Sequence, residues 1–124
     1  MQKIILIACL GAAGTVARYF VQGWVQRILG GNFPWGTLMV NLLGCFLFGI
    51  IWSIAEDRFL IKPEFRIILL VGFLGAFTTF STFIFESAEL LRDTQWHMAL
   101  LNLVGQNACG LILFFVGLFL GRIF

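Results

Sequence analysis

Charge is the scarcest property of this sequence. Only eight Lys and Arg and six Asp and Glu occur among its 124 residues, whereas 60% of the residues are hydrophobic. Soluble domains carry about 25% charged residues, and a chain this short keeps most of its residues near its surface. Because so few polar groups could not cover that surface, the composition all but excludes a soluble monomer.

Other scarce features exclude further classes. The net charge of +2 comes with no basic run, which argues against a nucleic-acid partner. Cys9, Cys45 and Cys109 are odd in number, lack C-x-x-C spacing and lie within apolar runs, so we interpret them as small hydrophobic residues. With one histidine, no Ser-His-Asp set and no glycine-rich phosphate loop, the chain is not expected to be an enzyme.

The few charges are clustered and leave long uncharged runs. Residues 28–55, 67–85 and 94–121 contain no Asp, Glu, Lys or Arg, and a fourth run from Ile4 to about Trp24 is mostly apolar. About 20 apolar residues in a helix cross the roughly 30 Å hydrocarbon core of a bilayer. We therefore predict an all-α membrane protein in which residues 1–124 form one transmembrane domain, with four spans at about 2–25, 36–55, 66–91 and 96–121.

The positive charges give only a weak orientation signal. Four spans place both termini on one side of the membrane. That side carries Lys3, Arg58, Lys62, Arg66 and Arg122, and the other side carries Arg27 and Arg92, with Arg18 near it. The positive-inside rule then favours cytoplasmic termini by a small margin, which permits insertion in both orientations.

Several polar side chains nevertheless lie deep within the expected spans. They are Arg18, Asn41, Thr78, Thr79, Ser81, Thr82, Asn102, Gln106 and Asn107. In hydrocarbon each costs free energy unless it finds a partner or faces water. A homo-oligomer whose subunits supply each other's polar surfaces is the simplest solution.

The stretch 72–83 in the third span is the most unusual of the chain. It combines two glycines, four Ser or Thr residues and four phenylalanines. Such a composition weakens a helix, and a break at membrane depth is tolerated only where it is buried in protein or lines a cavity. Freed carbonyls suit a hard cation, and the following amides and hydroxyls suit an anion. A continuous helix that packs through small residues explains the stretch equally well.

Two phenylalanines and an asparagine are candidate anion ligands. Phe80 and Phe83 lie on one helix face, and the partly positive ring edges could contact an anion without trapping it. Ordinary packing is the commoner role of such a pair in a chain with 15 Phe. Asn41 offers two hydrogen-bond donors and has no acidic neighbour, which favours an anion pathway over a cation pathway. An interhelical hydrogen bond explains Asn41 equally well.

The remaining polar residues of the spans allow more than one role. Asn102, Gln106 and Gly110 repeat every four residues, which suits a pore wall or close helix packing. Arg18 keeps its charge and could snorkel, pair with Glu86 or attract anions to a vestibule.

Three motifs resemble one known family. Residues 75–83, G-A-F-T-T-F-S-T-F, resemble the T-T-F-S-T-F signature of the Fluc (CrcB) fluoride channel family. Residues 36–44 are similar to its G-T-L-x-V-N-x-x-G segment, and residues 11–19 to its G-A-x-x-G-x-x-x-R-Y/W segment. The motifs occur in order on three of the four expected helices, so the resemblance covers essentially the whole chain.

The resemblance implies a fluoride-selective passive channel in the inner membrane of a bacterium, which exports fluoride and lowers its toxicity. It also implies an antiparallel, dual-topology homodimer with a third helix broken at mid-membrane and a structural sodium ion at the dimer interface. Matched residue by residue, the fluoride pathway would comprise Phe80, Phe83, Asn41, Ser81, Thr82, Thr37, Glu86 and Arg18, and the sodium would be held by the backbone carbonyls of Gly75 and Thr78. On the fourth helix Gln106, with Asn102 and Gly110, replaces the Tyr or His and Ser common in the family.

Two other functions remain as alternatives. A small proton-coupled multidrug exporter has similar size, but it needs a membrane-embedded Glu on its first helix, where this chain has Arg18. A non-transporting membrane assembly subunit would explain the glycines but not the combination of Asn41 with the Phe80 and Phe83 pair.

Overall fold

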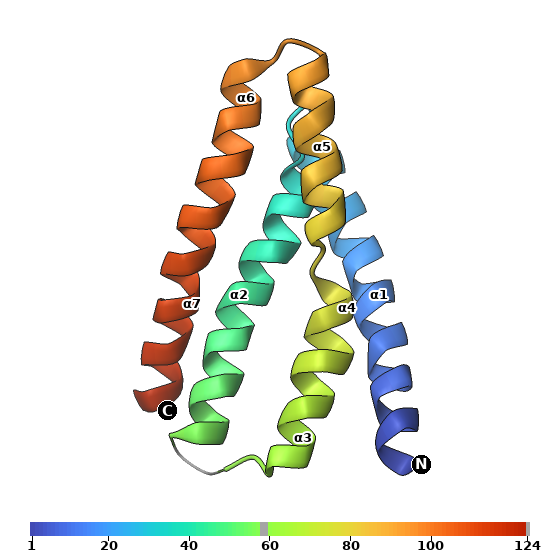
Figure 1. Cartoon of the computed structure of the whole chain (residues 1–124), viewed down its shortest axis with the longest axis vertical. Helices are drawn as coiled ribbons and strands as arrows, with labels where there is room; N and C mark the ends of the chain where they lie inside the picture. The colour runs from blue at the N-terminus through green and yellow to red at the C-terminus, as the bar shows by residue number, and fades with distance from the viewer. Residues whose placement is uncertain (58–59, 124) are drawn as a thin grey trace.

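The computed structural model describes residues 1–57 and 60–123, and every regular element in them is helical (Figure 1). The elements are α1 (Gln2–Leu29), α2 (Trp35–Glu56), α3 (Pro63–Ile67), η1 (Ile68–Leu74), α4 (Gly75–Phe77), α5 (Phe80–Arg92), α6 (Trp96–Leu100), η2 (Leu101–Gly105) and α7 (Gln106–Ile123). They form four rods, at 2–29, 35–56, 63–92 and 96–123, and each rod is long and apolar enough to cross a membrane. The expected all-helical fold with four long apolar helices is confirmed. Arg58, which entered the charge comparison, lies outside the described residues.

Glycine and proline set the ends of the first elements. Helix α1 continues past the expected end near Val25 to Leu29, because the first residue that leaves helical geometry is Gly30, at φ 63°. Gly31 follows at φ 75°, a left-handed conformation that glycine adopts at little cost. Pro34 then precedes α2, and Pro63 occupies the first turn of α3, where its missing N–H costs nothing.

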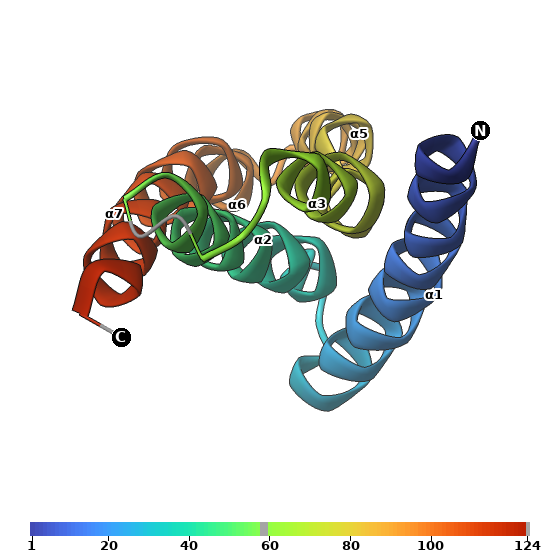
Figure 2. The same ribbon diagram turned by 90° about the horizontal axis from the view of Figure 1, so that it is seen from below.

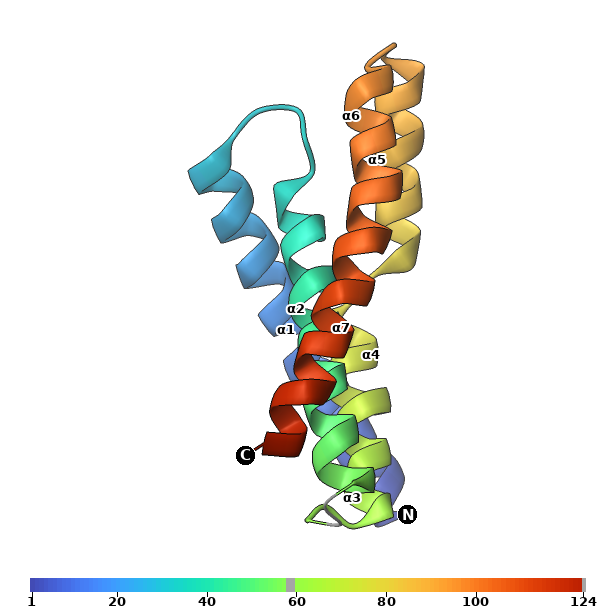
Figure 3. The same cartoon turned by 90° about the vertical axis from the view of Figure 1, so that its left-hand side faces the viewer.

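The rods run antiparallel in sequence order. Both termini and the α2–α3 connection lie at one end, and the α1–α2 and α5–α6 connections lie at the other (Figures 1 and 3). Seen along the rods, α2 lies between α7 on one side and the third rod and α1 on the other (Figure 2). Helix α2 is therefore the central element, and it reaches both halves of the molecule.

Glycines allow α2 and α7 to pack at close range. A Cβ on Gly49 would lie 2.2 Å from the carbonyl oxygen of Phe114, and one on Gly117 would lie 2.2 Å from that of Phe46. Such backbone-to-backbone contact is typical of helix pairs in membranes. On the other side of α2, the buried side chain of Val40 packs with Leu70, Leu74 and Phe77 of the third rod.

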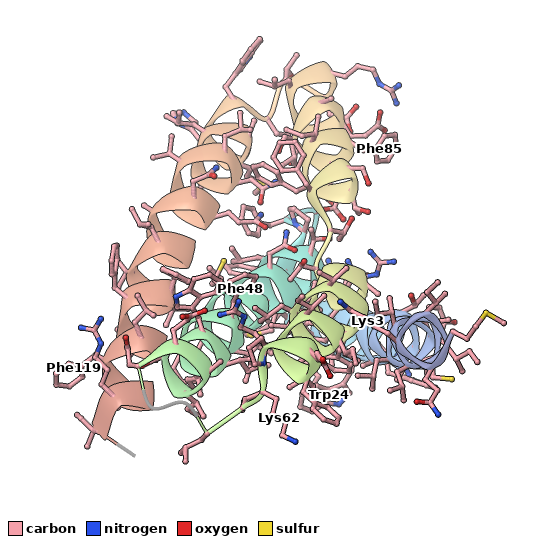
Figure 4. The ribbon with its side chains drawn as sticks, turned by 60° about the horizontal axis from the view of Figure 1, so that its bottom comes forward. Lys3, Trp24, Phe48, Lys62, Phe85 and Phe119 are labelled. Carbon is pink, nitrogen blue, oxygen red and sulfur yellow. The ribbon has the colours of Figure 1, made fainter. Side chains whose placement is uncertain are left out.

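The outer surface is apolar. Trp24, Phe85 and Phe119 are exposed, and Figure 4 shows Phe85 and Phe119 pointing away from the bundle. A surface of this kind is stable against lipid rather than water. The composition of the exterior thus agrees with a chain that spans a bilayer.

Ion pairs join the ends of the rods on the side of the termini. Arg66 forms an ion pair with Glu56, and Arg122 Nε donates to Asp57 Oδ2 at 2.8 Å. Ser53 also donates to Asp57, so hydrogen bonds from Arg122 and Ser53 hold the pKa of this carboxyl below its ordinary value. These contacts tie the end of α2 to α3 and α7.

Candidate functional site

The third rod is interrupted between α4 and α5. Thr78 and Thr79 are extended, with ψ angles of 161° and 114°. The N–H of Thr79 donates to Asn41 Oδ1 at 2.8 Å, and the N–H of Thr82 turns to Thr79 Oγ1 at 3.3 Å. Thr79 therefore caps α5. Asn41 of α2 provides the acceptor for the N–H of Thr79 that the preceding helical turn would provide in a continuous helix.

This interruption releases carbonyl oxygens of the preceding turn, among them those of Gly75 and Thr78. In a continuous helix the oxygen of Gly75 would accept from the N–H of Thr79, and that of Thr78 from the N–H of Thr82. Both donors are engaged elsewhere. The oxygen of Thr78 instead accepts from Arg18 Nη1 at 3.3 Å.

Asn41 connects α2, the interruption and the fourth rod. Its Nδ2 donates to the carbonyl oxygen of Thr79 at 3.0 Å and also to Gln106 Oε1. Its Oδ1 accepts from the N–H of Thr79. The interhelical hydrogen bond that the sequence left open for Asn41 is thus present, and both of its amide hydrogens are in use.

Phe80 and Phe83 lie at the start of α5, with ring centroids 5.7 Å apart. Their environments differ, because Phe83 is 4% exposed and Phe80 is 73% exposed. Both line a cavity of about 580 Å³ between α2, the third rod and α7, together with Asn41, Thr78 and Gln106. The described residues that line it are apolar, hydroxyl, amide or glycine residues, so its wall carries no formal charge.

A second, more polar cavity of about 670 Å³ lies between α1, α2 and α5, and Thr37, Thr82 and Glu86 line it. Thr37 Oγ1 donates to Glu86 Oε1 at 2.7 Å and accepts from Gln22 Nε2 at 3.0 Å. Among the described residues, Glu86 Oε2 has no hydrogen-bond partner although it is buried. Three of the expected pathway residues therefore meet here, while Ser81 is exposed and does not line this cavity.

Arg18 and Glu86 make separate contacts. Arg18 reaches the carbonyl of Thr78, and Glu86 accepts from Thr37. The pairing of these two residues, one of the three roles open to Arg18, is not among the ion pairs of the described residues. Arg18 instead supports the backbone at the interruption.

Known proteins are similar to this sequence over nearly its full length. Residues 5–118 match the family described as "CrcB-like protein, Camphor Resistance (CrcB)". The chain belongs to the CrcB family. Its relatives include the "Fluoride-specific ion channel FluC" of Nitrosococcus oceani, 54% identical over 98% of both chains, and that of Solidesulfovibrio magneticus, 53% identical over 99% of this chain and 98% of the relative. A relative of the same name from Geobacter sulfurreducens is 44% identical over 98% of both chains.

CrcB membership confirms the family that the three motifs indicated, and all three motifs lie within the matched residues. Together with the four long apolar helices, it makes the chain a multi-pass bacterial membrane protein. The relatives carry the name of an ion channel, which confirms the expectation that the chain is not an enzyme.

Two residues of this CrcB chain have contacts that the sequence did not reveal. Asn102 is fully buried, and its Nδ2 donates to Ser87 Oγ at 2.9 Å. Its Oδ1 accepts from Gln106 Nε2 at 3.1 Å. The four-residue spacing of Asn102 and Gln106 placed them on one helix face. No sequence pattern indicated that Ser87, on another helix, would be the hydrogen-bond partner of Asn102.

Proposed function

We propose that this chain is a fluoride-specific channel through which fluoride leaves the bacterial cytoplasm passively. The observation that carries the proposal is the uncharged cavity at the interrupted third rod, where Phe80 and Phe83 meet the side-chain amides of Asn41, Gln106 and Asn107. The CrcB relatives that match this chain over nearly its whole length are named fluoride-specific ion channels.

The chemistry of the cavity suits a small, strongly hydrated anion. A pore must replace the water around fluoride and still release it, so binding has to be neither absent nor tight. Phenyl ring edges and amide or hydroxyl donors provide partial positive charge without a fixed cation. In the proposed pathway Phe80 and Phe83 present ring edges, and the polar contacts come from Asn41, Thr37, Ser81, Thr82 and Glu86. Gln106 lines the pathway beside Asn41, and Arg18 holds the carbonyl oxygen of Thr78 at the interruption.

The functional unit in this proposal is an antiparallel homodimer. Phe80 is 73% exposed although it lines the cavity, so a single chain leaves one wall of the site open. A second copy in the opposite orientation would cover it. The interruption lies near the middle of the 63–92 rod, which supports a break at membrane depth where such a dimer would bury it.

The released carbonyls of Gly75 and Thr78 fit a sodium ion. Sodium favours hard oxygen ligands, and unwound backbone in membrane helices supplies them. Arg18 uses one side of the Thr78 oxygen, and a carbonyl oxygen has a second lone pair for a cation. Two copies would bring four such oxygens together, and the ion would be coordinated by them and join the two interruptions.

A reconstitution experiment tests the function. Purified protein is placed in liposomes loaded with potassium fluoride or potassium chloride, and efflux is followed with ion-selective electrodes after a potassium ionophore is added. We expect rapid fluoride efflux and chloride efflux no faster than from protein-free liposomes. Equal rates for the two anions, or no fluoride efflux, would overturn the proposal.

A further inference from the structure

The hydrogen bond from Asn41 to Gln106 of the fourth rod has a direction that the backbone of Thr79 fixes. A backbone N–H can only donate, so the Asn41 atom that faces the N–H of Thr79 must be its oxygen. Its nitrogen then faces the carbonyl oxygen of Thr79 and also Gln106. Because an amide nitrogen only donates, Gln106 must turn its own oxygen toward Asn41.

The same logic continues beyond Gln106. With its oxygen on Asn41, Gln106 donates through Nε2 to Asn102 Oδ1 at 3.1 Å, and Asn102 donates through Nδ2 to Ser87 Oγ at 2.9 Å. The hydroxyl of Ser87 donates to the carbonyl oxygen of Phe83 at 2.7 Å. We call Asn41, Gln106, Asn102 and Ser87 the amide relay. A backbone group fixes each of its ends.

Burial gives the relay its rigidity. Asn102 is 0% exposed, and Ser87 and Gln106 are also buried. A member that turns away leaves its neighbour unpaired where water does not replace the lost bond, which is far costlier than at a surface. The orientation of the Gln106 amide is therefore set by Asn102 on one side and by Asn41 on the other.

The relay occupies the donor that an anion would need. Both amide hydrogens of Asn41 are bound, one to the oxygen of Thr79 and one to Gln106 Oε1. Thr79 belongs to the backbone of the interruption, whereas the Gln106 amide stands on rotatable side-chain bonds. An anion that binds Asn41 must therefore displace the oxygen of Gln106 rather than that of Thr79.

We propose that Gln106 is a latch on Asn41 and that Asn102 is the positioning residue that holds the latch closed. The inference rests on the proposed fluoride pathway and assigns a role to a residue outside it. Asn102 acts by retaining Gln106 Nε2, which keeps Gln106 Oε1 on the donor of Asn41. Only the fraction of molecules with the latch open binds the anion at Asn41, so a weaker latch increases the apparent affinity for fluoride.

The test measures the initial rate of fluoride efflux from liposomes over a series of fluoride concentrations. Asn102→Leu should lower the half-saturating concentration about five-fold, the value of one net hydrogen bond. Gln106→Leu should lower it by a similar factor. In the double variant the effects should not add, because Asn102 acts through Gln106. Thr15→Val is the control, since Thr15 is exposed on α1 and its hydroxyl, among the residues that the structure describes, donates only to the oxygen of Gly11 of its own helix.

The outcomes separate the latch from the channel. Loss of folded protein lowers the maximal rate and leaves the half-saturating concentration unchanged, so a purely structural role of Asn102 gives a different result. If the wild type conducts fluoride and Asn102→Leu has the same half-saturating concentration as Thr15→Val, the latch is overturned and the channel function is not. If Asn102→Leu does not fold, Gln106→Leu decides by itself, and an unchanged or raised half-saturating concentration overturns the latch.

A second measurement does not depend on conduction. In ¹⁵N-labelled protein, the side-chain amide hydrogens of Asn41 should exchange with solvent faster in Gln106→Leu and Asn102→Leu than in the wild type or in Thr15→Val. Equal exchange in all four proteins overturns the latch even if the wild type passes no fluoride. Absence of fluoride efflux from the wild type overturns only the proposed channel function.

Discussion

At the scale of the residue, Phe80 and Phe83 have different structural roles despite their shared helix face. Phe83 is buried within the chain, and the carbonyl oxygen of the same residue receives the last bond of the amide relay. Phe80 is exposed, and its ring centroid lies 5.7 Å from that of Phe83. Substitution of Phe83 therefore affects both packing and the site, whereas substitution of Phe80 reports on the site with little effect on the fold of one chain.

We expect Phe80→Ile to suppress fluoride efflux and to lower the free energy of unfolding in detergent by less than Phe83→Ile does, because only the partner copy would cover its ring. Phe83→Ile should also suppress efflux but should destabilise the fold by about 1 kcal/mol, because its ring is packed. Efflux with a fluoride electrode and unfolding by circular dichroism measure the two effects. Phe119→Ile, on the outer face of α7, is the control, and unchanged efflux in both test variants would remove the two rings from the mechanism.

Sequence reasoning identified Asn41 and Gln106 as notable residues but could not assign their contacts. An amide can donate to an anion, to a neighbouring helix or to backbone, and the choice depends on which groups the fold brings near it. The structure brings Thr79 and Gln106 to Asn41. Arg18 likewise had three possible partners, and its contact with the carbonyl of Thr78 depends on an interruption whose position no periodicity specifies.

At the scale of the element, the four rods were predictable and their packing was not. The distribution of fourteen charged residues located the rods, because a charge within hydrocarbon is costly. The pairing of Gly49 with Phe114 and of Gly117 with Phe46 joins segments far apart in sequence. The interruption was expected only within 72–83, because Asn41 of another helix determines that it falls at Thr78 and Thr79.

Gly117→Ala should destabilise the protein by about 1–3 kcal/mol, because its new Cβ would lie 2.2 Å from a backbone oxygen of α2 that cannot move aside cheaply. Gly23→Ala is the matched control, since no atom of the described residues lies within 4 Å of a Cβ there. The control should be neutral or should stabilise α1 by up to about 1 kcal/mol. Thermal unfolding of both variants in one detergent measures the difference, and equal stabilities would contradict the proposed close crossing of α2 and α7.

The Asp57 contact with Arg122 should make stability depend on acid pH. The pKa of Asp57 is lowered in the folded protein by hydrogen bonds from Arg122 and Ser53, so its contribution is present above the unfolded value of about 3.9 and is lost as pH falls through the lower folded value. Wild type should therefore melt above Asp57→Asn at pH 7, and the difference between the two melting temperatures should shrink as the pH falls below about 3.9. A difference that does not shrink in acid would show that the side chain acts through packing rather than charge.

At the scale of the whole molecule, the distribution of positive charge determines how the chain can insert. Both termini and the α2–α3 connection share one end of the bundle, with Lys3 and Lys62 on that side and Arg27 and Arg92 at the opposite end. Because orientation follows the Lys and Arg bias of short loops, a small number of substitutions should suffice to fix it. An antiparallel dimer requires both orientations, so a chain fixed in one orientation should be unable to assemble alone.

Two variants test this requirement. Arg27→Gln with Arg92→Gln should hold the termini in the cytoplasm. Lys3→Gln, Lys62→Gln, Leu29→Lys and His97→Lys together should hold them outside, because they leave more Lys and Arg at the α1–α2 and α5–α6 connections than at the terminal end. We expect each variant alone to give little fluoride efflux from cells and a mixture of the two, expressed together, to restore it toward the wild-type rate, because each supplies the orientation that the other lacks. Labelling of a terminal tag from outside the cell verifies the orientations. Wild-type efflux from either variant alone would show that one orientation is sufficient and would exclude the antiparallel dimer as the conducting unit.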